Sequence, residues 1–557
     1  MDAFDEQFDF VVVGSGGGSM AAGLVMRQAG RSVLILEKTD LIGGSTAKAG
    51  GVMWIPANKY MAQAGVADTI EQGEAYLNAV VEAREGDAPG TSRERRRTYI
   101  TEANAMIDFL ERQGIEFERA PLWPDYYDDR DGGTAGRTVH AKVFDLNRLG
   151  EWKAKLRKGA FGFPLPIYEI TRLPLIKRSW QARRLAAKAV LKQMFEKLTG
   201  KEYATAGTAL QGRMLQAAVR EGVELRTGAD VKQVLQNAGG RVTGVEVEID
   251  GAVRRIGAKL GVLLNAGGFS HNQEMRDKYI PHTKVGWTHT APGDTGDMHR
   301  ELMRLGAHMA QMEEMVGNQM MLPPGADPGG AQMQLAKPHA FMVDQTGVRY
   351  MSEGGSYMLF CQSMLERHKT VPAVPSWMVM DSQFMRDHML ATSMPGSTRP
   401  AEWFTTGFLK KGATIEELAG EIGCDPATLK ASTERFNGFA RAGRDEDFGR
   451  GRNRYDAWLG DDTHQPNASL GTVEVGPFYA VQIVPGDVGT FGGAVTDSSA
   501  RVLREDGSAI EGLYATGTTS AAVMGRTYPG AGCSIGPSFT FGFVAAKHAA
   551  GLGNAGV

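Results

Sequence analysis

The stretch Phe8-Asp-Phe-Val-Val-Val-Gly-Ser-Gly-Gly-Gly-Ser19 decides the fold of this chain. A short apolar, β-branched run meets a cluster of glycines, and a stretch with helical spacing of Ala, Leu, Met and Val follows it to Ala29. A second apolar run over 32–36 ends in Glu37. This order of strand, glycine turn, helix and strand predicts a βαβ unit of the Rossmann type, which binds a dinucleotide at its first turn.

The glycine turn and Glu37 supply what a dinucleotide needs from a protein. The missing side chains let the backbone approach a pyrophosphate, and the following helix presents free N–H groups and the positive end of its dipole. Glu37 lies 23 residues after Gly14, where a carboxylate can accept hydrogen bonds from ribose hydroxyls. A structural glycine turn in another α/β fold is the alternative. The contacts predicted here are Gly14, Ser15, Gly16, Gly17, Gly18, Glu37 and Lys38.

A second glycine cluster directly after Glu37 favours FAD over NAD. The longer FAD molecule passes this region on its way to the isoalloxazine ring, so the backbone here must stay open. No histidine lies near the N-terminal glycine clusters, so we expect the FAD to be bound non-covalently. The contacts predicted in this second cluster are Gly43, Gly44, Ser45, Thr46, Gly50 and Gly51.

Two later strand-like runs end in glycine as the first one does. They are 261–265, followed by Ala-Gly-Gly, and 512–515, followed by Thr-Gly. The shared ending predicts one sheet assembled from distant parts of the chain. A helix that starts near Ser534 would point its N-terminus at the flavin and favour negative charge there. The further contacts predicted for the cofactor are Val231, Ala266, Gly267, Gly517, Ser534 and Ile535.

The predicted fold class is α/β, with a Rossmann-type FAD-binding domain built from discontinuous segments and an inserted α+β catalytic domain. The length of 557 residues supports more than one domain. We assign 1–284 and 475–557 to the FAD-binding domain. The Met-rich, irregular region 285–474 is assigned to the catalytic and substrate domain.

Composition narrows the class of protein. The formal net charge of −3 argues against nucleic-acid binding, which usually needs a basic domain. The sequence starts without an apolar leader, and no apolar run approaches the roughly 20 residues that span a bilayer. The three separated cysteines and eleven histidines offer neither a disulfide framework nor a metal-ligand spacing. We therefore expect a cytoplasmic protein without a bound metal.

The segment 153–201 differs from its surroundings because it carries thirteen Lys or Arg against two acids. One interpretation is a solvated basic face, the usual meaning of a run of charge. Aromatic, Pro and Leu residues interleave with the charges, however, and this pattern is typical of a segment that lies on anionic lipid. The second interpretation predicts a protein that is peripheral on the inner face of the cell membrane, and a bulky, sterol-derived substrate.

The closing stretch Thr527-Tyr-Pro-Gly-Ala-Gly-Cys-Ser-Ile-Gly536, taken with the glycine turn and Glu37, resembles the 3-ketosteroid Δ1-dehydrogenase family. Its broader relatives are the fumarate reductase and succinate dehydrogenase flavoproteins. The resemblance implies FAD-dependent removal of hydrogen from C1 and C2 of a 3-ketosteroid, with electrons passed on to a quinone or another acceptor. Polarisation of the C3 carbonyl needs two hydrogen-bond donors in a site without water. The hydroxyl of Tyr528 and the backbone N–H of Gly532, four residues later, could be these donors.

The same resemblance assigns the base to Tyr357 and a supporting hydroxyl to Tyr126. Tyr is a weak base with a pKa near 10, so it needs a hydroxyl partner and an already acidified proton. Two neighbours, Tyr350 and Tyr127, are alternatives for these roles.

Other functions remain open on the sequence alone. They are a 3-ketosteroid Δ4-(5α)-dehydrogenase, a fumarate-reductase-like enoate reductase and a non-catalytic flavin-binding module. The enoate reductase would use Arg526 to pair with a substrate carboxylate. We expect Asp294 and Asp297 to stabilise a turn.

Overall fold

The computed structural model describes residues 4–162 and 164–553, so Phe163 of the basic insertion lies outside the described residues. The first domain is organised around an eight-stranded sheet with the order β20-β21-β11-β1-β2-β8, to which β10 and β9 are added. The central strands β1, β2, β11 and β21 pair in parallel, which confirms one sheet assembled from distant parts of the chain. Their bounds are Glu6–Val13 for β1, Val33–Leu36 for β2, Glu224–Arg226 for β8, Ala229–Gln236 for β9, Val242–Ile249 for β10, Ala252–Leu264 for β11, Arg501–Leu503 for β20 and Ala509–Ala515 for β21.

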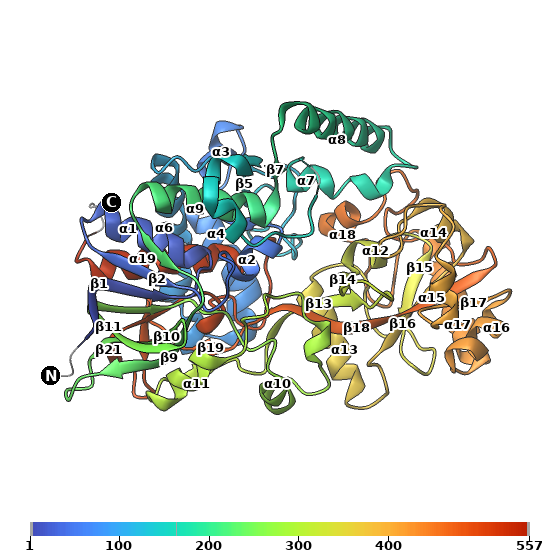
Figure 1. The fold of residues 1–557 in the computed structure, drawn as a ribbon. Helices are drawn as coiled ribbons and strands as arrows, with labels where there is room; N and C mark the ends of the chain where they lie inside the picture. The colour runs from blue at the N-terminus through green and yellow to red at the C-terminus, as the bar shows by residue number, and fades with distance from the viewer. Residues whose placement is uncertain (1–3, 163, 554–557) are drawn as a thin grey trace.

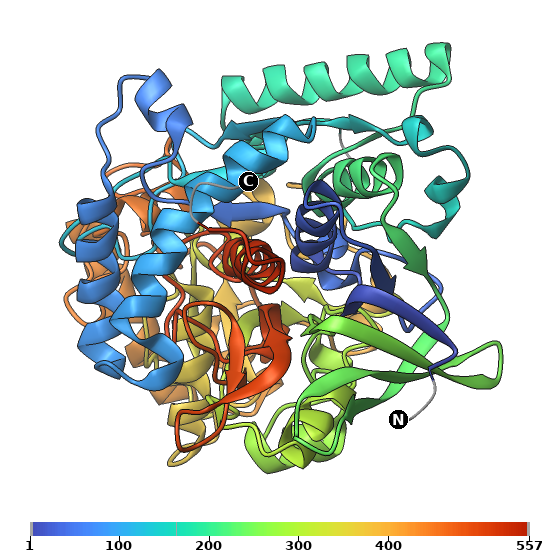
Figure 2. The same cartoon turned by 90° about the vertical axis from the view of Figure 1, so that its left-hand side faces the viewer.

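Two helices cross closely over this sheet, α1 (Gly17–Gln28) and α19 (Ile535–Ala549). Figure 2 shows them side by side and end on. A Cβ atom at Gly18 would lie 2.3 Å from the carbonyl oxygen of Ser538, and one at Gly542 would lie 2.2 Å from that of Gly18. The first glycine cluster therefore serves helix packing as well as the turn.

The second domain has a six-stranded sheet with the order β14-β13-β18-β16-β15, and β17 pairs with β18. The long strand β18 (Phe478–Thr490) runs through the middle of this sheet, at the right of Figure 1. The sequence assigned residues from 475 onward to the FAD-binding domain, and β18, which falls in that range, pairs with β13, β16 and β17 of this sheet. The bounds of the other strands are Met315–Met321 for β13, Gly329–Gly330 for β14, Ala340–Val343 for β15, Ser376–Met380 for β16 and Leu409–Gly412 for β17.

A three-stranded sheet and two helices complete the surroundings of the site. The sheet has the order β3-β5-β4, and the loop between β4 and β5 carries Tyr126. The bounds are Val52–Trp54 for β3, Phe117–Arg119 for β4, Thr138–Ala141 for β5, Ile70–Leu77 for α4 and Arg93–Arg112 for α6.

The basic insertion forms α7 (Ile167–Ile170), a short turn and α8 (Trp180–Thr199). In Figure 1, α8 lies along the top of the molecule, above the rest of the insertion. Ala182 and Ala189 are its buried side chains. Among the described residues, we find no helix with the length and apolar character needed to cross a bilayer.

Candidate active site

The first glycine turn has the geometry of a pyrophosphate cradle. Gly14 has a φ of +93°, and a Cβ atom there would lie 2.2 Å from the carbonyl oxygen of Asn265. Helix α1 starts directly after Gly16 without a side-chain cap, so its first N–H groups face outward unpaired by a side chain. This arrangement fits an anionic group placed on the helix axis.

Glu37 is held in position at the end of β2. The backbone N–H of Ser15 donates to one carboxylate oxygen at 3.1 Å, and that of Thr39 donates to the other at 2.9 Å. A carboxylate fixed in this way can accept hydrogen bonds from ribose hydroxyls. The neighbouring Lys38 forms an ion pair with Asp297 at 2.6 Å, and its ammonium donates to the hydroxyl of Thr295 at 2.9 Å.

The second glycine cluster starts the short helix α2 (Gly44–Lys48) and passes close to other backbone. Gly51 has a φ of +63°, and a Cβ atom there would lie 2.3 Å from the backbone of Ala206. Ser45 donates to Asp294 at 3.2 Å and accepts from the backbone N–H of Ala291 at 2.9 Å. Thr46 and Gly50 lie on the same short segment.

Asp294 has a larger role than the turn predicted for it. It is buried, receives the hydroxyl of Ser45, and would touch a Cβ atom at Gly267. Burial raises the pKa of Asp294 to about 7. Asp294 therefore joins Ser45 and Gly267, two of the predicted cofactor contacts. No local pattern indicates the contact with Ser45, because 249 positions separate the two residues.

The later glycines converge on the same place. Gly517 has a φ of +63°, and a Cβ atom there would lie 2.5 Å from Oδ1 of Asn265. Asn265 also donates to Ser19 at 2.9 Å, so it links the three strand ends. Helix α19 follows Ser534 without a side-chain cap. The backbone N–H of Gly536 donates to the carbonyl of Gly532 at 2.8 Å, and among the described residues the N–H of Ile535 has no acceptor and stays available for a ligand. Of the remaining predicted contacts, Val231 is buried on β9, and Ala266 and Ile535 follow β11 and begin α19.

Three tyrosines that lie far apart in the sequence have their rings close together in the structure. The ring centroids of Tyr357 and Tyr528 are 4.9 Å apart. The ring centroid of Tyr126 lies 5.6 Å from that of Tyr357 and 5.9 Å from that of Tyr528. Tyr357 is the first residue of α13 (Tyr357–His368), and the backbone N–H of Tyr126 donates to the carbonyl of Pro529 at 2.8 Å. The structure thus brings together the tyrosines that the sequence selected.

Gly532 completes the cluster. It has a φ of +102°, and a Cβ atom there would lie 2.5 Å from the carbonyl oxygen of Val52, so the position requires glycine. Gly532 is buried, yet within the described residues its backbone N–H has no hydrogen-bond acceptor. A buried and unpaired donor is costly unless a ligand accepts from it.

The electrostatics of the three hydroxyls differ. The Tyr528 hydroxyl lies 3.0 Å from that of Ser534, and burial raises the pKa of Tyr528 to about 12. Burial raises the pKa of Tyr357 much further, and the nearby Tyr126 and Tyr528 add to this. Burial also raises the pKa of Tyr126, while its hydrogen bonds to Tyr455 and Tyr357 oppose the rise. All three are hydroxyl donors at neutral pH.

Of the two alternatives for these roles, Tyr350 lies away from the cluster, whereas the side chain of Tyr127 hydrogen-bonds to Ser356, the neighbour of Tyr357. The hydroxyl of Tyr350 lies 2.7 Å from that of Ser376, and its ring packs into the core of the second domain. The backbone N–H of Tyr127 donates to the hydroxyl of Tyr76 at 3.1 Å.

Tyr455 is a member of the cluster that the sequence did not reveal. It lies on α18 (Arg454–Leu459), and its ring stacks on Tyr126 with a centroid distance of 4.1 Å. Gln332 donates to its hydroxyl at 2.7 Å. The signal in the sequence was weak, because Tyr455 stands in an irregular region without a motif.

The loop that carries Tyr126 is held by buried ionic contacts. Trp54 donates to Asp125 at 2.7 Å, and Arg137 pairs with Asp125 at 2.8 Å and with Asp68 at 2.7 Å. The side chains of the three ionised residues are at most 2% exposed. Such contacts fix the loop and leave little freedom to the ring of Tyr126.

Arg526 is not free to receive a dicarboxylate. Its guanidinium lies 2.9 Å from Glu85 and 3.4 Å from Glu314, and it also contacts Glu313. Three acids around one arginine argue against a further carboxylate at this place. Over 4–162 and 164–553, we find no group of His, Cys, Asp and Glu residues that could hold a metal ion.

The chain is similar to known flavoproteins over almost its whole length. Residues 9–535 match a family described as an FAD binding domain. A 3-oxosteroid 1-dehydrogenase of Mycobacterium tuberculosis is 37% identical, and the match covers 98% of this chain and 98% of that protein. A 4-oxocyclohexanecarboxylate 2-dehydrogenase of Sinomonas cyclohexanicum is 33% identical and covers 98% of this chain and 93% of its own.

The fold is similar to that of a solved structure. The crystal structure of the 3-ketosteroid Δ1-dehydrogenase from Sterolibacterium denitrificans, in complex with 1,4-androstadiene-3,17-dione, has a TM-score of 0.92 and 33% sequence identity. The match covers 98% of this chain and 100% of that one. The similarity therefore extends over both domains.

Proposed function

Since this chain belongs to the 3-oxosteroid 1-dehydrogenase family of FAD-dependent oxidoreductases, we propose that it converts a 3-keto-4-ene steroid to the 1,4-diene-3-one. The observation that carries this proposal is the meeting of Tyr126, Tyr357 and Tyr528 in one buried cluster. A buried site lined by rings suits a large apolar substrate, and neutral hydroxyls suit a ketone.

Polarisation of the C3 carbonyl is the first task of the residues. The hydroxyl of Tyr528 and the unpaired N–H of Gly532 donate to the C3 oxygen and stabilise the negative charge that develops there. The polarised carbonyl makes the C2 proton acidic. The N–H of Gly532 gains the acceptor that it lacks in the free protein.

Removal of the C2 proton is the second task. Tyr357, in its phenolate form, takes this proton on its oxygen and becomes the neutral hydroxyl, and Tyr126 supports the phenolate by hydrogen bonding. Bound FAD would supply the acceptor, at N5, for the hydride from C1 and an outlet for two electrons to a quinone or another acceptor. The dry surroundings of the tyrosines keep water away from the enolate.

The residues that would hold FAD fit it. The uncapped starts of α1 and α19, the fixed Glu37 and the glycines without room for a Cβ atom form one continuous set. Such a set supplies N–H groups for the pyrophosphate and a carboxylate for the ribose. We expect non-covalent binding, so acid precipitation should release the yellow cofactor; flavin that stays with the precipitated polypeptide would contradict this.

Two other substrates are outcomes of the same assay. The pairing of Arg526 with three acids disfavours a fumarate-like dicarboxylate. By its name, the relative from Sinomonas acts on a cyclohexanone that carries a carboxylate. This single ring corresponds to the ketone-bearing ring of a steroid without the other rings. A Δ4-(5α)-dehydrogenase would place the new double bond elsewhere in the same ring system.

Anaerobic reduction of the flavin tests the proposal directly. The holoenzyme is mixed with androst-4-ene-3,17-dione, cholest-4-en-3-one or 4-oxocyclohexanecarboxylate, and bleaching of the flavin is followed by absorbance. The position of the new double bond in the product is then determined. Rapid bleaching by a steroid with a C1–C2 double bond is expected. No bleaching by either steroid would refute the proposal and would favour the one-ring ketone or a non-catalytic flavin module.

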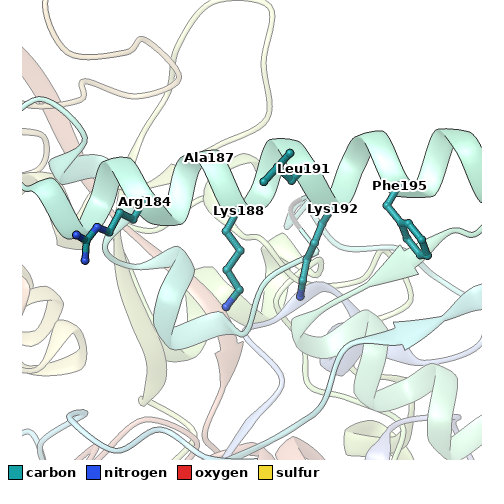
Figure 3. Close-up of a pocket in the computed structure, with 6 residues that line it drawn as sticks. All are labelled: Arg184, Ala187, Lys188, Leu191, Lys192 and Phe195. Atoms are coloured by element: carbon teal, nitrogen blue, oxygen red, sulfur yellow. The ribbon is translucent and has the colours of Figure 1, made fainter.

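The exposed face of α8 supports a second part of the proposal, contact with an anionic membrane surface. Trp180 is 64% exposed, Leu191 65% and Leu198 84%, and these positions lie on one side of the helix. Figure 3 shows Leu191 pointing away from the body of the protein, while Lys188 and Lys192 point toward it. Apolar residues outside and cations beneath them suit a shallow position among lipid headgroups.

Sedimentation with liposomes tests this part. The wild type should sediment with phosphatidylserine-containing vesicles, and a variant with Leu191→Glu and Leu198→Glu should not. Val253→Glu, which changes an exposed residue on β11, is the matched control. Equal sedimentation of the wild type and the α8 variant would remove the membrane contact, and a dimer that disappears in the variant would assign this face to a second copy.

A further inference from the structure

Helix α18 connects the tyrosine cluster with the second domain. Besides Tyr455 it carries Trp458, whose ring stacks on Trp123 with a centroid distance of 4.6 Å. At its start, the backbone N–H groups of Arg454 and Tyr455 donate to Asp128 at 3.2 and 3.4 Å. Trp123 and Asp128 belong to the loop that carries Tyr126. One end of α18 is therefore tied to this loop.

The other end of α18 is held by a buried cation. Lys337 is 3% exposed, and its ammonium donates to the carbonyls of Leu459 and Gly460 at 2.5 and 2.7 Å. These are the last carbonyls of the helix, where a cation is favourable. In the part of the chain that the structure describes, no carboxylate lies within 4.0 Å of this ammonium. These two hydrogen bonds of the Lys337 ammonium therefore both go to the end of α18.

The next residue of the chain, Asp461, is held by the basic insertion. Arg178 lies in the segment that leads into α8, and its Nε atom is 3.0 Å from Asp461 and its guanidinium 3.8 Å from Asp387. Nearby, Arg172 lies 3.4 Å from Asp462. Asp461 is fully buried, so its charge depends on these contacts. The insertion thus reaches across to the end of α18.

We propose that Arg178 is a positioning residue of the active site, which acts through Asp461 and α18 to hold Tyr455 against Tyr126. The ring of Tyr455 and its hydrogen bond fix the hydroxyl of Tyr126, which in turn supports Tyr357. The catalytic part of this inference rests on the function proposed above, whereas the positional part does not.

The geometry separates positioning from general stability. Asp461 also accepts from the backbone N–H of Thr463 at 2.9 Å and from its hydroxyl at 2.6 Å. The local turn therefore keeps its own hydrogen bonds when Arg178 is replaced. What is lost is the link between the insertion and the end of α18.

Arg178→Ala is the test, and Arg184→Ala is its matched control. Arg184 is an arginine of the same insertion, but its guanidinium contacts the ring of Trp180, within α8. The stacked pair of Trp123 and Trp458 gives a circular-dichroism couplet that reports the position of α18 and does not require activity. We expect Arg178→Ala to weaken the couplet and to lower kcat about tenfold with KM changed less than twofold. Arg184→Ala should leave all three quantities unchanged.

Arg178→Lys keeps the charge beside Asp461 and should restore most of the couplet and of kcat. If Arg178→Ala retains the wild-type couplet and kcat, the proposal is wrong. Equal losses in Arg178→Ala and Arg178→Lys would also contradict it, because the ion pair would then not be the cause. If the wild type does not oxidise a ketosteroid, the proposed function fails, while the couplet of the holoenzyme variants still decides the position of α18. Should Arg178→Ala fail to retain FAD, Arg178→Gln provides the same comparison with a smaller change of volume.

Discussion

Tyr357→Phe is the most direct test of the proposed chemistry. The substitution keeps the ring, so the packing distances of 4.9 Å to Tyr528 and 5.6 Å to Tyr126 are preserved. Only the hydroxyl and its hydrogen bonds are lost, which costs about 1 kcal/mol of stability. A positioned general base contributes about 10²–10⁴ to the rate, equivalent to about 3–5 kcal/mol. The kinetic effect should therefore far exceed the effect on stability.

Anaerobic stopped-flow spectroscopy with substrate deuterated at C2 measures this effect. In Tyr357→Phe, flavin reduction and exchange of the C2 deuterium should fail together, while spectral changes on ligand binding persist. Tyr350→Phe is the matched control, since it removes a hydroxyl that lies 2.7 Å from Ser376 in the second domain. That variant should lose about 1 kcal/mol of stability and reduce its flavin normally. Reduction of the flavin at the wild-type rate by Tyr357→Phe would refute the assignment of the base.

Three further predictions follow from buried groups of the site. Tyr528→Phe should lower kcat about 10²–10³-fold with a small change in KM, because its hydrogen bond strengthens as the enolate forms; equal losses in kcat and ligand affinity, measured by flavin perturbation, would contradict this. Asp125→Ala should destabilise the protein by about 3–5 kcal/mol in denaturant unfolding because it leaves Arg137 short of a buried partner, whereas the exposed Asp108→Ala should cost less than about 1 kcal/mol. Asp294 has a pKa raised by burial to about 7, so the folded FAD-free protein holds a proton that the unfolded chain releases, and stability should fall as the pH rises from about 4 to about 7. Asp294→Asn should remove that slope in thermal unfolding of the FAD-free protein, and an unchanged slope would show that another group causes it.

The first glycine turn could be predicted because its backbone conformation restricts which residue can stand there. A position such as Gly14, with a φ of +93° and a carbonyl 2.2 Å from any Cβ atom, admits only glycine, so the requirement appears in the sequence. Tyr528 and Gly532 were selected because the glycine-rich stretch 527–536 resembles a known family, and their roles stay a prediction. The contacts of Asn265 and Asp294 were not predicted, because a single polar side chain outside a motif carries no recognisable sequence pattern.

The second domain and α18 were harder to predict because their interactions are non-local. The pairing of β18 with β13 and β16 could not be predicted, since the pattern of a strand does not indicate its partners. Tyr455 lies on α18, which contacts Asp128 and Lys337 from distant parts of the chain. No spacing within the sequence encodes such a convergence.

The order of the pKa values explains the division of labour between Tyr528 and Tyr357. Tyr528, with a pKa of about 12, is easier to ionise than Tyr357, although Tyr357 is the proposed base. The pKa of Tyr528 is held down by hydrogen bonds from the side chain and backbone of Ser534, at the positive start of α19. Those surroundings stabilise an anion, which is what the C3 oxygen becomes as the enolate forms.

A strong hydrogen bond requires donor and acceptor of similar proton affinity. The hydrogen bonds of Ser534 oppose the rise that burial causes in the pKa of Tyr528, and this suits donation to an enolate oxygen better than proton abstraction. Tyr357 lies where burial and two neighbouring hydroxyls disfavour its phenolate, so its rarely formed anion is the stronger base. The rate should therefore rise with pH across the neutral and alkaline range, as the small ionised fraction of Tyr357 grows. Replacement of Ser534 by Ala should slow flavin reduction by weakening the stabilisation at Tyr528, without moving this pH dependence. A Ser534→Ala enzyme whose pH profile shifts by a full unit would instead place the titrating base at Tyr528.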